Sequence, residues 1–333
     1  MMRALVYTAK EEVQLQERAR PAARTGEQEL TVELSGICGS DMSGFLGHSP
    51  RRKPPLILGH ELTGWLSNGK RAVANPLVSC GRCSRCLAGA QNLCAAWRLL
   101  GLDRTEGSFA EFVTLPSEQI FEIPTTLSSR RAVLAEPLAN IVHLYRIAAP
   151  PAFFRLAIVG AGTMGALALQ AGKRLGARDI LCVDVNGQRL AAMKQMGASE
   201  TLQVGAKAPT GVTSPPTDAE FDLVIDASGS TEARQTAFDI CRPGGQVALL
   251  GMAQQRSEID FVTSIRKEHR VVMSFAYTPI DFRRALDLLI GGEIELDDWT
   301  EMVPLENGQQ AFEKMTRAPG ATLKMLLSVR KSL

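Results

Sequence analysis

The chain has 333 residues, of which 45% are hydrophobic and 22% charged, with a formal net charge of +2. This length predicts two domains and is sufficient to bury a large core without disulfide bonds. The near balance of charge and the aromatic content of 5% argue against nucleic acid or an acidic membrane surface as a partner.

The first residues and the cysteines bear on the cellular compartment. Met1 to Tyr7 run directly into Lys10-Glu11-Glu12, without the apolar segment of a secretory signal, and no stretch reaches the roughly 18 apolar residues of a membrane span. The seven cysteines are odd in number, and four of them lie between Cys80 and Cys94. Such a set favours metal binding over disulfides. We therefore expect a soluble, cytoplasmic protein of a reducing compartment.

The first 150 residues or so are predicted to be rich in β-strands. Runs of branched and aromatic residues at 4–8, 30–34 and 112–115 are typical of short strands. Asn68-Gly69, between two strand-like arms, indicates a tight hairpin because this dipeptide tolerates two positive φ angles. The proline-rich segment 49–55 is predicted to be an exposed loop.

After Pro150-Pro151 the pattern changes to strands that alternate with helices. Apolar strands are predicted at 156–159, 180–183, 223–225 and 247–250, and helices at 164–175, 188–196, 231–241 and 281–290. Such alternation indicates βαβ units and a parallel sheet. Segment 206–218, with its three prolines, is predicted to be a surface loop.

One glycine-containing loop carries four cysteines with the spacing Cys-x2-Cys-x2-Cys-x7-Cys: Cys80, Cys83, Cys86 and Cys94. Four thiolates at this spacing suit a tetrahedral Zn²⁺ without an open coordination position, so we predict a structural zinc site. An iron–sulfur cluster and incidental loop cysteines are the alternatives. Cys182 and Cys241 are predicted to be structural, with Cys241 near the end of a helix.

A glycine motif lies between a predicted strand and a predicted helix, and five of its residues are expected to contact a dinucleotide: Gly160, Gly162, Thr163, Met164 and Gly165. In this context G-x-G-x-x-G indicates dinucleotide binding, although an ordinary strand–helix turn is the alternative. The glycines permit the turn, the approach of the pyrophosphate and close helix–strand packing, and the helix N-terminus favours phosphate.

Asp184 ends the next predicted strand. A carboxylate there can accept hydrogen bonds from both ribose hydroxyls and would repel a 2′-phosphate, which predicts NAD rather than NADP. Arg189 could weaken this preference as a cofactor-binding residue. An exposed helix charge, or a contact near the adenine, is the interpretation that we favour.

A third set of motifs is dispersed: Cys38-Gly39-Ser40-Asp41, His60-Glu61 after Gly59, and Glu136-Pro137. Each is weak alone, since a lone cysteine is usually a small buried apolar residue. Their order, together with the four-cysteine loop and the glycine motif, resembles the zinc-dependent medium-chain alcohol and polyol dehydrogenases over essentially the whole chain. The glutamates point to the sorbitol dehydrogenase-like branch.

The resemblance implies an α/β fold in which a Rossmann doubly wound parallel sheet accompanies a β-rich, GroES-like catalytic domain. The catalytic domain with the zinc sites would comprise 1–148 and 280–333, and the dinucleotide-binding domain would comprise 149–279. One catalytic and one structural Zn²⁺ per chain and NAD would be the cofactors. By analogy with relatives, we expect a homodimer or homotetramer.

The resemblance also implies a role for individual residues. The implied ligands of the catalytic zinc are Cys38, His60, Glu61 and, directly or through the zinc-bound water, Glu136. Asp41 would fix the orientation of the His60 ring, and Ser40 would pass the alcohol proton to a relay. Zinc would act as a Lewis acid while hydride passes from the alcohol to the nicotinamide.

The match departs from the family at several positions. Where many relatives carry a relay histidine this chain has Ser43, so the outer relay would use Ser43, water or the cofactor ribose, with His48 as a less favoured substitute. Phe275-Ala276-Tyr277 keeps a substrate-binding tyrosine of the polyol branch but lacks its arginine. Arg51-Arg52-Lys53 could bind a sugar phosphate, although we favour a solvated loop.

The leading hypothesis is a zinc- and NAD-dependent oxidoreductase that oxidises a secondary alcohol (a polyol, cyclitol or sugar derivative) to a ketone. A sugar-phosphate or L-threonine dehydrogenase of the same family remains open. A non-catalytic zinc- and nucleotide-binding homologue and a zinc-free quinone reductase are disfavoured by the complete set of motifs. The partner would be a small-molecule alcohol or ketone, and the sequence names neither it nor the preferred direction.

Overall fold

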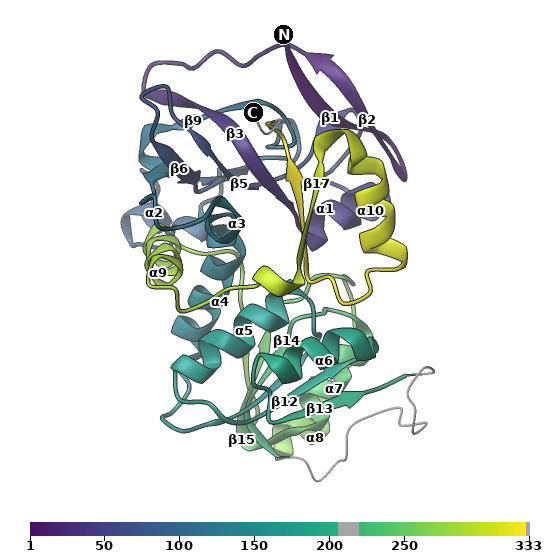
Figure 1. The fold of residues 1–333 in the computed structure, drawn as a ribbon. Coiled ribbons are helices and arrows are strands. Elements are labelled where there is room, and N and C mark those ends of the chain that lie inside the picture. Colours follow the sequence, from purple (N-terminus) through teal and green to yellow (C-terminus); the bar gives the residue numbers. More distant parts are fainter. Residues whose placement is uncertain (206–219, 331–333) are drawn as a thin grey trace. The chain divides into compact units, whose positions relative to one another are not determined.

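A computed structural model describes residues 1–205 and 220–330 of the chain (Figure 1). The predicted loop 206–218 lies outside the described residues. The chain divides into two compact units, Met1–Ala139 together with Tyr277–Leu333, and Asn140–Ala276. Within the described part, no helix combines the length and apolarity needed to cross a membrane.

The first unit is rich in β-structure, as expected. Its strands are β1 (Met2–Ala9), β2 (Glu12–Arg18), β3 (Glu27–Ile37), β4 (Leu56–Ile57), β5 (Glu61–Trp65), β6 (Arg71–Ala74), β7 (Leu77–Val78), β8 (Arg98–Leu99), β9 (Phe112–Pro116), β10 (Ile120–Glu122), β17 (Thr300–Pro304) and β18 (Lys324–Ser328). One sheet has the order β10-β6-β5-β3-β18-β17, with β9 paired to β3, and smaller sheets are β2-β1-β4 and β7-β8.

Two features of this unit position the site described below. Strand β3 lies between β5 and β18, so the last strand of the chain returns beside an early one. The predicted hairpin is confirmed, since β5 and β6 pair antiparallel around Asn68-Gly69. Of these two residues only Gly69 has a positive φ, so the turn does not use the two positive φ angles that the dipeptide tolerates.

Short helices complete the unit: α1 (Gly39–Phe45), α2 (Ser84–Leu87), α3 (Ser129–Ala132), the start of α4 (Ala135–Ala148), α9 (Pro279–Ile290) and α10 (Gly308–Arg317). Helix α10, yellow in Figure 1, contacts β2 from the purple beginning of the chain. The buried rings of Phe45 on α1 and Phe312 on α10 stack with centroids 4.9 Å apart. This apolar contact fixes α1, whose first turn carries candidate site residues.

The second unit contains the predicted parallel sheet, with the order β13-β12-β11-β14-β15-β16. The strands are β11 (Arg155–Val159), β12 (Arg178–Asp184), β13 (Glu200–Gln203), β14 (Phe221–Asp226), β15 (Cys241–Leu249) and β16 (Arg270–Met273), and the helices are α5 (Thr163–Arg174), α6 (Gly187–Gln195), α7 (Thr231–Asp239) and α8 (Phe261–Arg266). The predicted α/β class with a doubly wound sheet is confirmed. The order reverses between β11 and β14, where such sheets bind ligands.

Cys241 lies near the end of a helix as expected, but the bound of the predicted helix 231–241 is wrong. Helix α7 ends at Asp239, and Cys241 is the first residue of β15. The thiol is buried, and Cys241 pairs with Phe221 of β14, after which the register shifts and regular pairing resumes at Gln246. The small apolar side chain of Cys241 suits either element, which is why the boundary could not be placed from the sequence alone.

Candidate active site

The four cysteines of the 80–94 loop converge around the short helix α2. All four sulfur atoms lie within 4.8 Å of one another, and none of the cysteines forms a disulfide. The Sγ atoms of Cys83 and Cys86 are 3.5 Å apart, and the backbone N–H groups of Cys80 and Ala96 each donate to Cys94 Sγ over 3.4 Å. Backbone N–H donors also lower the pKa of Cys80 to about 6. Four convergent cysteine sulfurs of this kind fit a closed tetrahedral metal site.

A second group of metal-ligating side chains is formed by Cys38, His60 and Glu61, with ligand atoms all within 4.8 Å of one another. Cys38 caps α1, His60 directly precedes β5 and Glu61 begins it; His60 and Glu61 are 3% and 1% exposed. Gly59 before them has a φ of +94°, and a Cβ there would lie 2.5 Å from the Phe109 ring. Only glycine fits, which explains the Gly-His-Glu motif.

Asp41 connects the two segments that supply this group. Its Oδ2 accepts the backbone N–H of Cys38 over 3.1 Å, and its Oδ1 accepts that of Gly59 over 3.3 Å. The same Oδ1 lies 3.5 Å from Nδ1 of His60 and 3.6 Å from Nε of Arg52. Burial tends to raise the pKa of Asp41, but His60 and Arg52 outweigh it and lower the pKa to about 2. Asp41 is thus an ionised carboxylate beside His60.

Lys324 and Glu136 surround the group on its other sides. The ammonium group of Lys324, on β18, pairs with the Glu61 carboxylate and donates to the carbonyl of Ile37 over 3.2 Å. Glu136 is buried in the first turn of α4 but is outside the set of three converging ligands. Burial raises the pKa of Glu136, while the charge of His60 and an interaction with Tyr277 oppose this shift.

Sequence reasoning singled out Tyr277 but missed Lys324. Tyr277 is 1% exposed, and burial together with the charge of Glu136 raises the pKa of its hydroxyl well above 10. Lys324 is also 1% exposed. The available signal was a lysine between the apolar residues Leu323 and Met325, where a strand residue is expected to be buried. A lysine is almost never fully buried unless it is paired, so this position indicated a buried ion pair.

The basic segment 51–53 does not form one cluster. Arg51 pairs with Asp103, with Nη2 and Oδ2 2.6 Å apart. Arg52 is 6% exposed and donates from Nη2 to Oγ of Ser40 over 3.0 Å. The prediction of an exposed loop for 49–55 is therefore wrong at Arg52. Its guanidinium is buried because Ser40 Oγ and the Asp41 carboxylate lie there as partners. Only Lys53 remains exposed and without a described partner.

The glycine motif follows β11 in the second unit. Gly160 has a φ of +112°, Gly162 caps α5, and a Cβ on Gly165 would overlap the carbonyl of Gly160. Asp184, at the end of β12, accepts the backbone N–H of Ala161 over 2.6 Å and that of Asn186 over 2.7 Å. These are the features that bring a pyrophosphate to a helix N-terminus and a carboxylate to the adjacent ribose.

Arg189 and the remaining residues of the motif lie on the following helices. Thr163 and Met164 begin α5, and Arg189 lies in the first turn of α6. Burial lowers the pKa of Arg189, and the charge of Asp184 opposes this shift. Arg189 is thus partly buried near Asp184, so the expectation of an exposed helix charge is wrong, while the alternative of a contact near the adenine stays a prediction.

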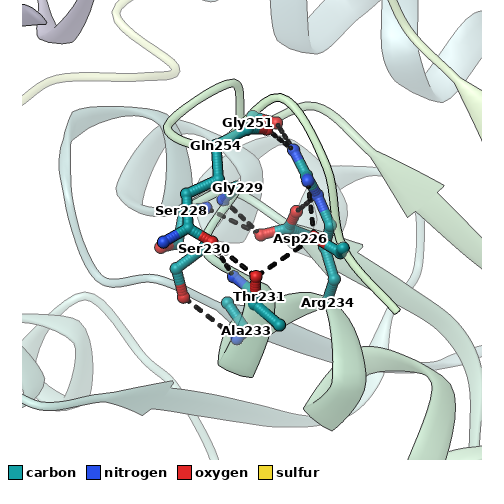
Figure 2. A network of polar contacts seen from close by, with 10 residues as sticks. Asp226, Ser228, Gly229, Ser230, Thr231, Ala233, Arg234, Gly251 and Gln254 are labelled. Carbon is teal, nitrogen blue, oxygen red and sulfur yellow. Dashed lines mark hydrogen bonds and ion pairs between the residues drawn. The ribbon is translucent and has the colours of Figure 1, made fainter. Parts of the chain in front are cut away.

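A network that sequence reasoning missed lies where β14 and β15 end (Figure 2). Asp226 accepts the backbone N–H groups of Ser228 and Gly229 over 3.0 and 2.7 Å, and its Oδ2 lies 3.6 Å from Nε of Arg234. Arg234 in turn donates to the carbonyl of Gly251 over 3.2 Å. The network holds together two loops beside the point where the strand order reverses. An acidic residue at the end of an apolar strand was the available signal.

Comparisons with known proteins agree with this chemistry. Residues 24–125 match the family described as alcohol dehydrogenase GroES-like domain, and residues 163–291 match the family described as zinc-binding dehydrogenase. The "Probable D-xylulose reductase A" of Aspergillus clavatus is 30% identical over 330 residues, which cover 93% of this chain and 92% of that protein.

Two solved structures extend the similarity to the fold. A structure from Sinorhizobium meliloti bound to NADP is 28% identical, with a TM-score of 0.87 and 99% of each chain covered. Galactitol-1-phosphate dehydrogenase from Escherichia coli is 26% identical, with a TM-score of 0.88 and coverage of 98% of this chain and 100% of that one. The resemblance drawn from the motifs is confirmed. The chain belongs to the zinc-dependent medium-chain alcohol and polyol dehydrogenases, and it is an oxidoreductase whose cofactors are zinc and a nicotinamide dinucleotide.

Proposed function

We propose that the protein oxidises a secondary alcohol of the polyol, cyclitol or sugar-derivative class to a ketone, with NAD as hydride acceptor. The observation that carries this proposal is the convergence of Cys38 with the buried His60 and Glu61 beside Asp41. Three protein ligands of mixed type leave a coordination position for substrate, as catalytic zinc requires. The names of the xylulose reductase and the galactitol-1-phosphate dehydrogenase support the substrate class.

Each residue of the group has a distinct task in this proposal. Cys38, His60 and Glu61 hold the metal, and Glu136 binds it through water because it lies outside their convergence. Zinc supplies Lewis-acid polarisation of the alcohol oxygen. Oδ1 of Asp41 lies 3.5 Å from Nδ1 of His60 and would orient the ring so that Nε2 is left for the metal. The remaining proton transfer, from the substrate hydroxyl, is the task of Ser40.

The other predicted residues are assigned to the binding of the second zinc and of the dinucleotide. We assign Cys80, Cys83, Cys86 and Cys94 to a structural zinc. The glycine motif from Gly160 to Gly165 binds the pyrophosphate, and Asp184 accepts the ribose hydroxyls, which favours NAD. Arg189 lies beside Asp184 and contacts the adenosine part. The similar Sinorhizobium meliloti structure is bound to NADP, so the experiment below compares both cofactors.

A sugar phosphate is a less favoured substrate. Arg51 is engaged by Asp103, and Arg52 by Ser40, so segment 51–53 offers only Lys53 to a phosphate group. L-threonine is a further substrate that the ligand set permits. A non-catalytic homologue would be hard to reconcile with the intact, buried ligand set.

Domain roles follow the same division. We assign catalysis and both zinc sites to 1–148 and 280–333, and dinucleotide binding to 149–279. We further propose a cytoplasmic homodimer or homotetramer. The support is edge strand β16, on which Val271 and Met273 are 45% and 76% exposed, beside α8 with Phe261 68% exposed. An exposed apolar edge of this kind pairs readily with a second copy.

The decisive experiment measures zinc content and NAD(P)H absorbance at 340 nm for a panel of polyols, sugar phosphates and amino alcohols. We expect two zinc ions per chain and reduction of NAD by one or more secondary polyols. Two zinc ions without oxidation of any alcohol would favour the non-catalytic homologue. A faster reaction with NADP would overturn the role given to Asp184.

A further inference from the structure

The guanidinium of Arg52 is buried, and the space that its side chain fills is left by Gly44. Its side chain is 6% exposed and passes over Gly44 in helix α1. A Cβ on Gly44 would lie 2.6 Å from Cδ and 3.0 Å from Cβ of Arg52, so the side chain can enter only because residue 44 is glycine. Burial of a charged group is unfavourable unless partners compensate it. The partners of Arg52 therefore show what it does.

Those partners are Asp41 and Ser40, which stand next to each other in the first turn of α1. Nε of Arg52 lies 3.6 Å from Oδ1 of Asp41, and Nη2 donates to Oγ of Ser40 over 3.0 Å. The charge of Asp41 stabilises the buried guanidinium, while the fork of the guanidinium reaches past it to the hydroxyl. Because arginine only donates and does not deprotonate, Ser40 can only accept in this contact.

We propose that Arg52 is a positioning residue for alcohol oxidation, which it serves by fixing the direction of the Ser40 hydroxyl. A hydroxyl oxygen has two acceptor sites and one proton. Arg52 fills one acceptor site, so that one acceptor site and the proton remain for the relay. The inference rests on the proposed function, in which Ser40 takes the proton of the substrate.

The proton transfer balances without any change at Arg52. The substrate hydroxyl gives its proton to Oγ of Ser40 as Ser40 releases its own proton to water on the outer side. The substrate carbon gives its hydride to NAD⁺, so the alcohol loses two electrons and two hydrogens and becomes a ketone. Arg52 keeps all its protons and holds Oγ in place throughout.

The kinetic test uses four variants of the zinc-loaded enzyme. Arg52→Met should lower kcat about 10- to 100-fold, the usual effect of losing a group that supports an active-site residue, with KM changed less than about twofold. Arg52→Lys, which keeps a charged donor, should recover part of the loss. Gly44→Ala displaces Arg52 without removing it and should also lower kcat. Arg51→Met, which removes the neighbouring exposed charge, should leave kcat unchanged.

A double-mutant cycle separates positioning from general damage. If Arg52 acts through Ser40, the double variant Arg52→Met/Ser40→Ala should have a kcat within about twofold of that of Ser40→Ala alone. An undiminished effect in that background, or an Arg52→Met enzyme with the kcat of the unmodified protein, overturns the inference.

A spectroscopic test does not depend on turnover. The zinc-loaded protein is labelled with ¹⁵N-arginine, and the NMR resonance of the Arg52 side chain is assigned by its loss in Arg52→Met. Ser40→Ala should shift this resonance and should leave the Arg51 resonance in place. If the unmodified protein oxidises no alcohol, the proposed function fails while this measurement still decides whether the contact exists. An Arg52 resonance unaffected by Ser40→Ala overturns the inference in either case.

Discussion

The ammonium group of Lys324 lies against the carboxylate of Glu61, and each side chain is only 1% exposed. The pair bridges β18 and β5, the two strands that flank β3. Gly36 on β3 makes room for it, since a Cβ at this position would overlap the carboxylate and approach the lysine stem. A proposed zinc ligand thus has a buried cation as its permanent neighbour, which balances its charge and limits its movement.

Replacement of Lys324 by methionine should lower the free energy of unfolding by about 3–5 kcal/mol, because Glu61 would keep a buried charge without its partner. Chemical denaturation of the zinc-free protein, in which no metal compensates the charge of Glu61, measures this. Lys314→Met is the matched control, since Lys314 pairs with Glu301 at the surface, where the side chains are 42% and 44% exposed. A surface pair contributes about 1 kcal/mol or less. Equal losses in the two variants would contradict a buried role for Lys324.

Replacement of Cys83 by serine should reduce the zinc content from two ions per chain to one and lower the melting temperature. Its Sγ lies 3.5 Å from that of Cys86 and 3.9 Å from that of Cys94, so its loss opens the four-thiolate site. Atomic absorption of the dialysed protein gives the count. Cys241→Ala, in the core of the other unit, should retain both ions. Two ions in Cys83→Ser would remove the case for a structural zinc in this loop.

Replacement of Asp184 by serine should decrease kcat/KM for NAD by about 10- to 100-fold, because hydrogen bonds from hydroxyls to a carboxylate are lost. The ratio of NADP to NAD efficiency should rise, since the repulsion of a 2′-phosphate disappears as well. Initial rates at 340 nm with each cofactor test this. Asp179→Asn, at a side chain 71% exposed, is the control and should leave both efficiencies unchanged. An unaltered ratio in Asp184→Ser would place cofactor selection elsewhere.

The main architecture could be predicted because the hydrophobic pattern of each strand and helix, and the glycine motif, are contained in short continuous segments of the sequence. The alternation after residue 150 indicated the parallel sheet, and the glycine motif lies between β11 and α5 as expected. The convergence of Cys38, His60 and Glu61 joins two segments that only the family resemblance could connect. Lys324 and Arg52 escaped prediction because their partners, Glu61 on another strand and Ser40 in helix α1, are set by tertiary packing. No local periodicity records such a pairing.

The exposed edge of the second unit provides the last prediction. Val271 and Met273 are alternate residues of β16 and share one face of the strand, which within residues 1–205 and 220–330 has no neighbour beyond β15 in the sheet. Replacement of both by lysine should dissociate the proposed homo-oligomer, because a charged edge strand opposes pairing with a second copy. Size-exclusion chromatography with light scattering should then show a mass nearer that of one chain, 36.0 kDa. The control is Met302→Lys on β17, which lies at one end of the largest sheet of the first unit; its side chain is 52% exposed, and the mass should not change. An oligomer that survives the double replacement must assemble through another surface.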